Sequence, residues 1–420
     1  MTPAGRLQAA IDVLDQIASS RQPADQVLRT WGGAHRYAGS KDRKAVAERV
    51  YLCLRQPPRM GEGGRGRVLA SLALHDGLSE AEIAALFSGQ GHAPGPLTAD
   101  EAITLTAPSQ AALPGFIEAQ LKLSFGDDWA AEAEALLSSR APLDLRVNGV
   151  KGTIEQATEA LAEAGLEVEP TPWSAFGLRL IAPAADLAPL DVFKSGVIEV
   201  QDEGSQIAAW LVGAERGETV VDYCAGGGGK TLAIGQAMRG QGRLIACDLN
   251  PRRLDAIKPR LHRAGVYAEF RRVGPTGDPL DDLRGQADRV LVDAPCSGSG
   301  TWRRRPEEAW RLTEAELERL AGLQLEILGR AADLVRPGGR LIYVTCSVLA
   351  AENGAVTEAF AATRPEFSPL PIERAAQPPM LTIPGRRRLA ELAQGGHGVQ
   401  LSPRRSGTDG FYICLFERTA

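Results

Sequence analysis

The sequence predicts an α/β protein in three parts. Apolar residues in the first part, 1–138, recur at the spacing of helices, which predicts an all-helical domain. Residues 139–205 combine short strand-like runs with a helix-like stretch and predict a small α+β unit. Over 206–420 strands and helices alternate, which is typical of a Rossmann-like, doubly wound parallel sheet with helices on both faces.

Helical periodicity in the first part covers four stretches: 7–18, 42–55, 80–87 and 115–137. Two segments rich in proline and glycine, 57–66 and 88–97, predict loops or hinges between helices. In the second part, Thr153 is placed to open the helix TIEQATEALAEAG. Three runs there are predicted strands: PLDLRVN, LRLI and VIEV.

The third part contains four predicted strands: ETVVDYC, RLIACD, DRVLVDAP and RLIYVTCS. Helices are expected from Lys230, after Pro251 and over 313–335. Residues 369–398 are predicted to be a long irregular insertion. A turn signal at 407–410, followed by an apolar run, suits an antiparallel pair that closes the edge of the sheet.

Composition excludes several classes of protein. The formal charge of -5 over 420 residues argues against a uniformly basic coat for nucleic acid. Three basic runs, at 303–305, 386–388 and 404–405, can contact phosphate, although each alone has the composition of a solvated surface. No stretch reaches the roughly 18 apolar residues of a membrane span, and the start lacks the apolar core of a signal peptide. We therefore expect no membrane partner and a cytoplasmic location.

Six cysteines, at 53, 224, 247, 296, 346 and 414, lack the Cys-x-x-Cys pairs that zinc sites favour. In a chain too large to need disulfides they predict reduced thiols and no metal. Because nothing in the sequence demands a dimer, we expect a monomer.

A glycine-rich segment from Asp222 to Thr231 follows a predicted strand and precedes a helix, where backbone can approach a ligand. Spacing excludes a P-loop, since the residue six positions before Lys230 is Cys224 and not glycine, and no G-x-G-x-x-G register fits a dinucleotide. The next strand ends in Asp248, which can accept both hydroxyls of a ribose. The alternative for Asp248 is a cap on the following helix. Together with the glycine loop, Asp248 predicts a site for an adenosine-containing ligand.

Two cysteines follow predicted strands. Cys296 stands in DAPCSGSGT and Cys346 in TCS, both in turns bounded by Ser, Thr, Gly or Pro. At the carboxyl ends of strands a thiol can be ionised by nearby dipoles or cations. The other reading of a cysteine, a buried inert thiol, is adopted for three: Cys53, Cys247 and Cys414.

These motifs together resemble the Sun-type (NSUN/RsmB-like) RNA cytosine-5 methyltransferases: the glycine loop, Asp248, DAPCSGSGTWRRRPEEAW and YVTCS. PLDLRVN, VQDEGSQ and GTDGFY are similar to flanking segments of that family, so the resemblance covers roughly 141–420. The helical part, with GSKDRKAVAERVYLCLR, resembles the NusB-like domain of bacterial members that methylate small-subunit ribosomal RNA. The resemblance implies an RRM-like RNA-binding unit at 139–205, S-adenosyl-L-methionine as cofactor and small-subunit ribosomal RNA as partner.

For the site, the resemblance implies that Cys346 adds to C6 of cytosine, so that C5 attacks the methyl group, and that Cys296 assists release. Asp293 would lie between cofactor and base and stabilise developing charge; its alternative is a turn-forming aspartate. The implied cofactor-binding residues are Cys224, Ala225, Gly226, Gly227, Gly228, Gly229, Lys230, Asp248 and Asp293, with Asp278 chosen near the adenine. Departures from the family pattern are Gly226-Gly227 in place of Ala-Pro, and RRRPEE in place of Arg-Arg-Asn-Pro-Asp.

Other functions stay open. A methyltransferase acting on protein or a small molecule would share the sheet, but nitrogen or oxygen methylation leaves two strand-end cysteines unexplained. A DNA cytosine methyltransferase would need Cys296 without demanding Cys346. An RNA-binding or ribosome-assembly factor could keep the methyltransferase fold without catalysis, and would then bind no cofactor. A family member acting on another RNA, such as tRNA, would differ in substrate alone.

Overall fold

The structure is a computed structural model that describes residues 1–20, 22–56, 63–106, 113–138, 140–181, 186–274, 280–375, 379–393 and 398–419. It contains two compact units. The first comprises Met1–Ala119, Leu137–Ser139 and Trp302–Leu312, and the second comprises Gln120–Leu136, Arg140–Thr301 and Thr313–Ala420. Within these units, the division into domains at 138 and 205 stays a proposal.

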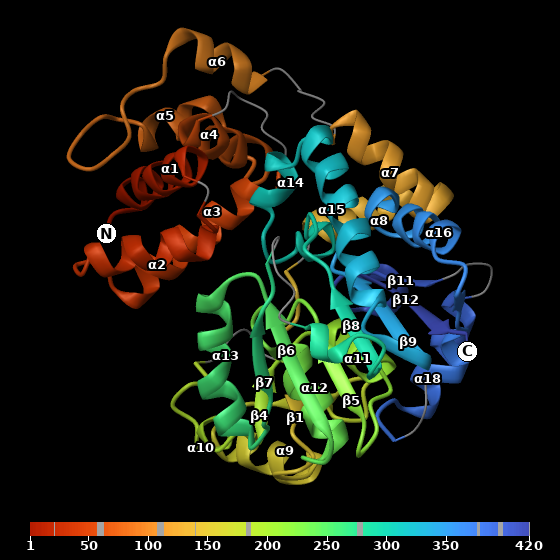
Figure 1. Ribbon diagram of the computed structural model, residues 1–420. Helices are drawn as coiled ribbons and strands as arrows, with labels where there is room; N and C mark the ends of the chain where they lie inside the picture. Colours follow the sequence, from red (N-terminus) through yellow and green to blue (C-terminus); the bar gives the residue numbers. More distant parts are fainter. Residues whose placement is uncertain are drawn as a thin grey trace. The chain divides into compact units, whose positions relative to one another are not determined.

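The first unit is built from helices, which are labelled in Figure 1: α1 (Pro3–Ser19), α2 (Ala24–Ala34), α3 (Ser40–Arg55), α4 (Gly64–Leu74), α5 (Glu80–Leu86), α6 (Ala99–Thr106) and α14 (Glu307–Arg311). Helices α1, α3 and α5 confirm the predicted periodicity. The prediction of a loop over 57–66 was wrong at its end, because α4 begins at Gly64. A Cβ at Gly64 would lie 2.4 Å from the carbonyl oxygen of Ile11, so this glycine permits close packing on α1 and does not break a helix.

The segment Trp302–Leu312 is part of the helical unit. Trp310 Nε1 donates to Leu54 O at 2.7 Å, Arg311 donates to Ile17 O at 2.6 Å, and Glu307 accepts the Ala24 N–H at 2.9 Å. The basic run at 303–305 is therefore not entirely solvated, because Arg303 is buried.

The helix predicted over 115–137 is two helices, α7 (Gly115–Phe125) and α8 (Trp129–Ser138), joined by the 3₁₀ turn η1 (Gly126–Asp128). Gly126 has a φ of +58°, a left-handed conformation that ends α7.

The second unit contains a four-stranded antiparallel sheet of order β2-β3-β1-β4. Its elements are β1 (Asp144–Val147), α9 (Ile154–Glu163), β2 (Val168–Pro170), β3 (Gly177–Leu180), α10 (Asp191–Lys194) and β4 (Ile198–Val200). Thr153 caps α9, as predicted, in a capping box with Gln156.

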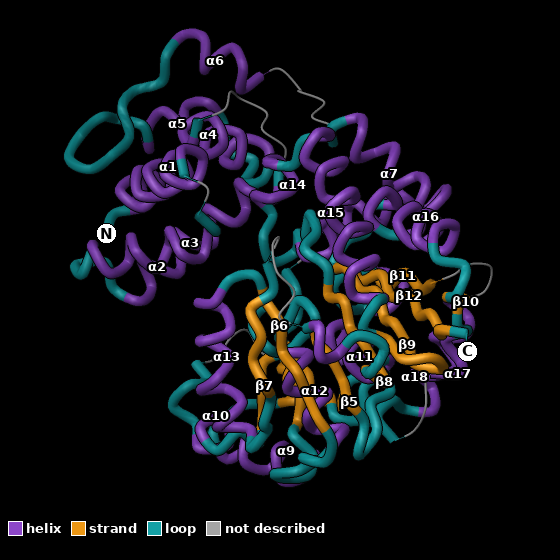
Figure 2. Tube along the Cα trace, viewed as in Figure 1, coloured by secondary structure: helices purple, strands orange, loops and turns teal. Residues whose placement is uncertain are grey.

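The large sheet of the second unit has the order β10-β12-β9-β8-β5-β6-β7, with β11 paired to β12. Its strands are β5 (Thr219–Asp222), β6 (Arg243–Asp248), β7 (Glu269–Arg272), β8 (Ala287–Asp293), β9 (Val335–Thr345), β10 (Phe367–Pro369), β11 (Gly398–Leu401) and β12 (Phe411–Arg418). Strands β5 to β9 are parallel, and β10, β11 and β12 pair antiparallel, which confirms the Rossmann-like prediction and the antiparallel closure. Figure 2 shows these strands in orange.

Alternating strand residues bury opposite faces of this sheet. Val220 and Ile342 pack with α11 (Glu203–Leu211), α12 (Gly229–Met238) and α13 (Pro251–Ala264). Val221 and Tyr343 pack with α15 (Glu314–Ala332) and α16 (Gly354–Thr363) on the other face. The remaining short elements are η2 (Asp281–Leu283), η3 (Ser299–Thr301), η4 (Ala350–Glu352), α17 (Ile372–Ala375), α18 (Ile383–Ala393) and α19 (Pro403–Ser406).

The prediction of an irregular insertion over 369–398 was wrong, because α17 and α18 lie within it. Helix α18 has little apolar periodicity to reveal it, since Gly385 and Leu389 are its buried residues. Across the described residues, every helix is too short or too polar to span a bilayer.

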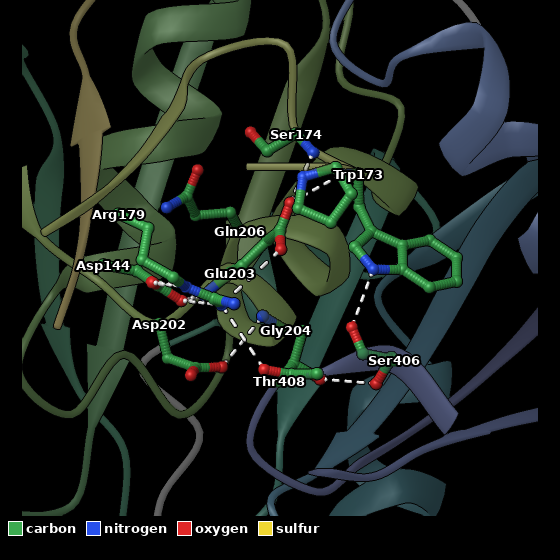
Figure 3. A network of polar contacts seen from close by, with 12 residues as sticks. Asp144, Trp173, Ser174, Arg179, Asp202, Glu203, Gly204, Gln206, Ser406 and Thr408 are labelled. Atoms are coloured by element: carbon green, nitrogen blue, oxygen red, sulfur yellow. Dashed lines mark hydrogen bonds and ion pairs between the residues drawn. The ribbon is translucent and has the colours of Figure 1, made fainter. Parts of the chain in front are cut away.

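A buried polar network joins the small sheet to α11, which packs against the large sheet (Figure 3). Arg179 on β3 makes a paired hydrogen bond to Asp144 on β1, at 2.7 and 3.0 Å. Glu203, at the start of α11, accepts the N–H groups of Trp173 and Ser174 at 2.6 and 2.9 Å. Because these acceptors are ionisable and fully buried, their partners are needed for stability.

We predict that Arg179→Ala lowers the free energy of unfolding by about 3–5 kcal/mol, since it leaves the buried Asp144 carboxylate without its cation. Arg243→Ala is the matched control, because the Arg243–Glu269 pair is also bidentate but its side chains are 39% and 41% exposed. That control should lose about 1 kcal/mol or less. Equal losses in a urea titration of the two variants would contradict the assigned role.

Candidate functional site

The glycine loop connects β5 to α12 at the carboxyl edge of the large sheet. Gly226 and Gly228 have φ values of +53° and +78°, which lets the chain turn tightly after Asp222. The loop is anchored to the neighbouring strand because Ala225 N donates to Cys247 O at 2.7 Å. Cys224 lies half-buried in this loop, and burial, followed by the nearby carboxylates, raises its pKa well above the ordinary value.

Asp248, at the end of β6, lies directly against the glycine loop. One carboxylate oxygen accepts the Gly226 N–H at 2.9 Å, and the other accepts the Asn250 N–H at 2.7 Å. The alternative role as helix cap falls to Asn250, whose side chain accepts the Arg252 N–H at the start of α13. The structure therefore brings together the two predicted halves of the cofactor site. Asp278, the residue chosen near the adenine, lies outside the described residues.

Lys230 and Asp293 form an ion pair across the same edge, with Nζ 2.7 Å from Oδ2. Burial of the Lys230 ammonium lowers its pKa, but the charge and hydrogen bond of Asp293, with a further contribution from Cys346, outweigh burial and raise it overall. Lys230 therefore stays charged at neutral pH. The Lys230 Nζ atom also lies 5.2 Å from the centroid of the Phe411 ring on β12, which is a cation–π contact.

The two predicted cysteines meet at the ends of β8 and β9. Their sulfur atoms lie 3.4 Å apart, and both side chains are half-buried. The hydrogen bond to Cys346 and then burial raise the pKa of Cys296 well above the ordinary value of a thiol. Cys296 therefore keeps its proton at neutral pH, and Cys346 can act as its hydrogen-bond acceptor. The three cysteines read as inert, Cys53, Cys247 and Cys414, are buried.

Sequence reasoning missed two residues that hold the cysteine turns. Glu352 accepts hydrogen bonds from Ser297 and Ser347, each of which directly follows one of the cysteines. Asn353 accepts from Thr345 Oγ1 at 2.6 Å and donates to Ser347 O at 3.0 Å. Their position shortly after TCS, as adjacent polar residues between apolar runs, was the available signal. Across the described ranges, His, Cys, Asp and Glu form no cluster suited to a metal ion.

Two family models match the chain. The model for the 16S rRNA methyltransferase RsmB/F matches residues 209–417, which run from the end of α11 into β12. A model for the ferredoxin-like domain of RsmF/B-like methyltransferases matches residues 113–185.

Curated relatives agree with these models. A Bacillus subtilis protein named "Probable ribosomal RNA small subunit methyltransferase B" is 34% identical over 65% of this chain and 59% of its own length. The ribosomal RNA small subunit methyltransferase B of Pseudomonas syringae is 35% identical over 73% of this chain and 66% of its own. The match thus spans about three fifths to two thirds of the length of these relatives.

Solved structures share the fold. PH0851 superposes with a TM-score of 0.77 over 100% of this chain and 99% of its own, at 24% identity. A methyltransferase homologue from Pyrococcus horikoshii superposes with a TM-score of 0.57 over 71% of this chain and 93% of its own, at 26% identity. The stretches matched by the two family models together exceed half of the chain. The chain belongs to the RsmB/F family of methyltransferases.

Proposed function

We propose that the protein is an S-adenosyl-L-methionine-dependent RNA (cytosine-5)-methyltransferase acting on small-subunit ribosomal RNA. The observation that carries this proposal is the 3.4 Å separation of two sulfur atoms, Cys296 and Cys346, at the ends of adjacent parallel strands beside a glycine loop. Methylation at a ring carbon requires a covalent activator, because C5 of cytosine is a poor nucleophile. Methylation at nitrogen or oxygen leaves such a cysteine pair without a role.

The residues at the sheet edge suit S-adenosyl-L-methionine. The Asp248 carboxylate has lone pairs beyond those used by Gly226 and Asn250, and can accept ribose hydroxyls. Among the described residues, a Cβ at Gly226 would contact the backbone oxygen of Cys224 alone, at 3.8 Å, so the space beside this glycine is open for a ligand. We propose that the loop from Cys224 to Lys230, Asp248 and Asp293 hold the cofactor, which supplies the methyl group.

In the proposed reaction the Cys346 thiolate forms a bond to C6 of the cytosine, and the displaced electron pair makes C5 nucleophilic. C5 would take the methyl group as the bond from that group to the cofactor's sulfur breaks. C5 then loses its proton to water, the C5–H electron pair forms the C5=C6 double bond, and the C6–S bond breaks with its electrons returning to the Cys346 sulfur as thiolate. Cys296, held beside the Cys346 sulfur, assists this release.

We propose that Asp293 binds the base. Its side chain is 30% exposed, and one oxygen is held by Lys230. The carboxylate can accept a hydrogen bond from the cytosine and stabilise charge that develops as the thiolate adds. Asp278 remains our proposal for the adenine contact.

RNA as the substrate rests on the family and on the names of its relatives, which act on ribosomal RNA of the small subunit. We propose that the helical unit and the small sheet bind RNA outside the catalytic edge. Exposed basic residues on α3, Lys41 and Lys44, are suited to phosphate contacts.

The roles of the cysteines predict different failures of their alanine variants. Cys346→Ala cannot bond to C6, so neither methylated RNA nor a covalent adduct should form. Cys296→Ala should still attack and methylate, but should accumulate protein joined to RNA, visible as a slow band on a denaturing gel that nuclease removes. The adduct should require both RNA and methyl donor. If the Cys346→Ala variant accumulated the protein–RNA adduct instead, the roles of the two cysteines would be reversed. Full activity of both variants would rule out the two-cysteine mechanism.

Asp248→Ala should weaken binding of S-adenosyl-L-methionine by about 10- to 100-fold, the equivalent of about 1.5–3 kcal/mol for hydrogen bonds to a charged group. Calorimetry measures this directly. Asp255→Ala serves as control, because Asp255 is exposed on α13 and pairs with Lys258. An unchanged Kd for Asp248→Ala would show that the Asp248 carboxylate takes no part in cofactor binding and serves only its hydrogen bonds to Gly226 and Asn250.

Bisulfite sequencing of total RNA from cells with and without the protein tests the substrate. We expect one or a few cytosines of small-subunit ribosomal RNA to lose protection when the protein is absent. Loss of protection in tRNA alone would replace ribosomal RNA as the proposed substrate.

A further inference from the structure

Glu352 is a fully buried carboxylate next to the cysteine pair, and the proposed reaction assigns it no part. It ends the 3₁₀ turn η4, six residues after Cys346. Its Oε1 accepts the Ser297 N–H at 2.8 Å and Gln324 Nε2 at 2.9 Å. Its Oε2 accepts the hydroxyls of Ser297 and Ser347, the latter at 2.6 Å.

Four hydrogen-bond donors converge on the Glu352 carboxyl group. An ionised carboxylate is an acceptor only, with about four lone-pair sites, and four donors occupy them here. Removing the carboxyl group would leave these buried donors without an acceptor, which is unfavourable. The number of acceptor sites on an ionised carboxylate thus matches the number of donors around Glu352.

The serine partners connect Glu352 to both reacting residues. Ser297 directly follows Cys296, and Ser347 directly follows Cys346, so one carboxylate joins the turns at the ends of β8 and β9. Ser299 Oγ adds a 2.8 Å contact to Ser347 Oγ, and Tyr343 OH donates to the Glu352 carbonyl at 2.6 Å. The turns cannot separate without breaking these bonds.

Electrostatics gives Glu352 a second effect. The groups that face the Cys296 thiol are Cys346, Glu352, Tyr343 and the N–H of Gly298. After the hydrogen bond to Cys346, burial and the charge of Cys346, the charge of Glu352 further raises the pKa of Cys296. Removing that charge should make the Cys296 thiol more acidic.

We propose that Glu352 is a positioning residue that fixes the two cysteines at reacting distance and, through its buried charge, keeps Cys346 as the nucleophile of the pair. This inference rests on the proposed cytosine-5 chemistry, in which the two thiols have different roles. Glu352 acts through the serines and the field at Cys296, and need not touch the substrate.

Glu352→Gln tests the proposal, because it keeps the shape and removes the charge. Alkylation by iodoacetamide at a series of pH values, with each cysteine followed by peptide mass spectrometry, measures the acidity of each thiol in the full chain. We expect the midpoint for Cys296 to fall by about one pH unit, at the low end of what a close like charge exerts. We also expect kcat to fall about 10- to 100-fold with KM for RNA unchanged, as for misplaced reacting groups.

Glu203→Gln is the matched control. Glu203 is also fully buried and accepts two backbone N–H groups, but it belongs to the network between the sheets. It should leave the Cys296 midpoint unchanged. A Cys296 midpoint that does not move in folded Glu352→Gln overturns the proposal, whatever the activity.

If Glu352→Gln does not fold, Ser297→Ala provides the test, because it removes one hydroxyl and retains the Ser297 N–H bond. Its kcat should fall about tenfold, the equivalent of one hydrogen bond to a charged group, and an unchanged kcat overturns the proposal. The alkylation assay uses neither RNA nor cofactor. Failure of the proposed methylation would appear as absent product with the alkylation shift intact, so the two failures are distinguishable.

Discussion

The parallel pairing of β8 with β9 is the constraint on which the site depends. Asp293 is in register with Val344, and the pairing continues past the strand ends, where Ala294 N donates to Val344 O and Gly300 N donates to Cys346 O. A shift of register by one residue would turn the side chains to the opposite face. The cysteines therefore meet because two backbone segments far apart in the sequence are held in one register.

A second contact links this edge to the turn before β12. Gly410 N donates to Gly300 O at 2.8 Å, and a Cβ at Gly300 would lie 2.1 Å from Gly410 O, so the two backbones touch without side chains between them. The preceding Asp409 N–H is held by Asp202, at the N-terminus of α11. The turn before β12 and Glu352 thus both support the cysteine turn.

Much of this arrangement could be predicted from the sequence, because strand-helix alternation and glycine turns are local signals. Asp248 and the two cysteines stand at strand ends that the apolar runs already delimit. The buried contacts of Glu352 could not be predicted, since its partners are 5, 28 and 55 residues away in sequence. Helix α4 was missed for the same reason, because a glycine such as Gly64 indicates a loop until its close contact with α1 is known. The packing of Trp302–Leu312 in the helical unit was also missed, because an arginine such as Arg303 indicates an exposed surface until its burial is known.

The central claim is that two thiols serve methylation at a ring carbon. The most direct measurement is mass spectrometry of nucleosides from small-subunit ribosomal RNA that has been incubated with the purified protein and isotope-labelled S-adenosyl-L-methionine. The account predicts that the label appears in 5-methylcytidine. Label in a nitrogen- or ribose-methylated nucleoside, with none in 5-methylcytidine, would contradict it.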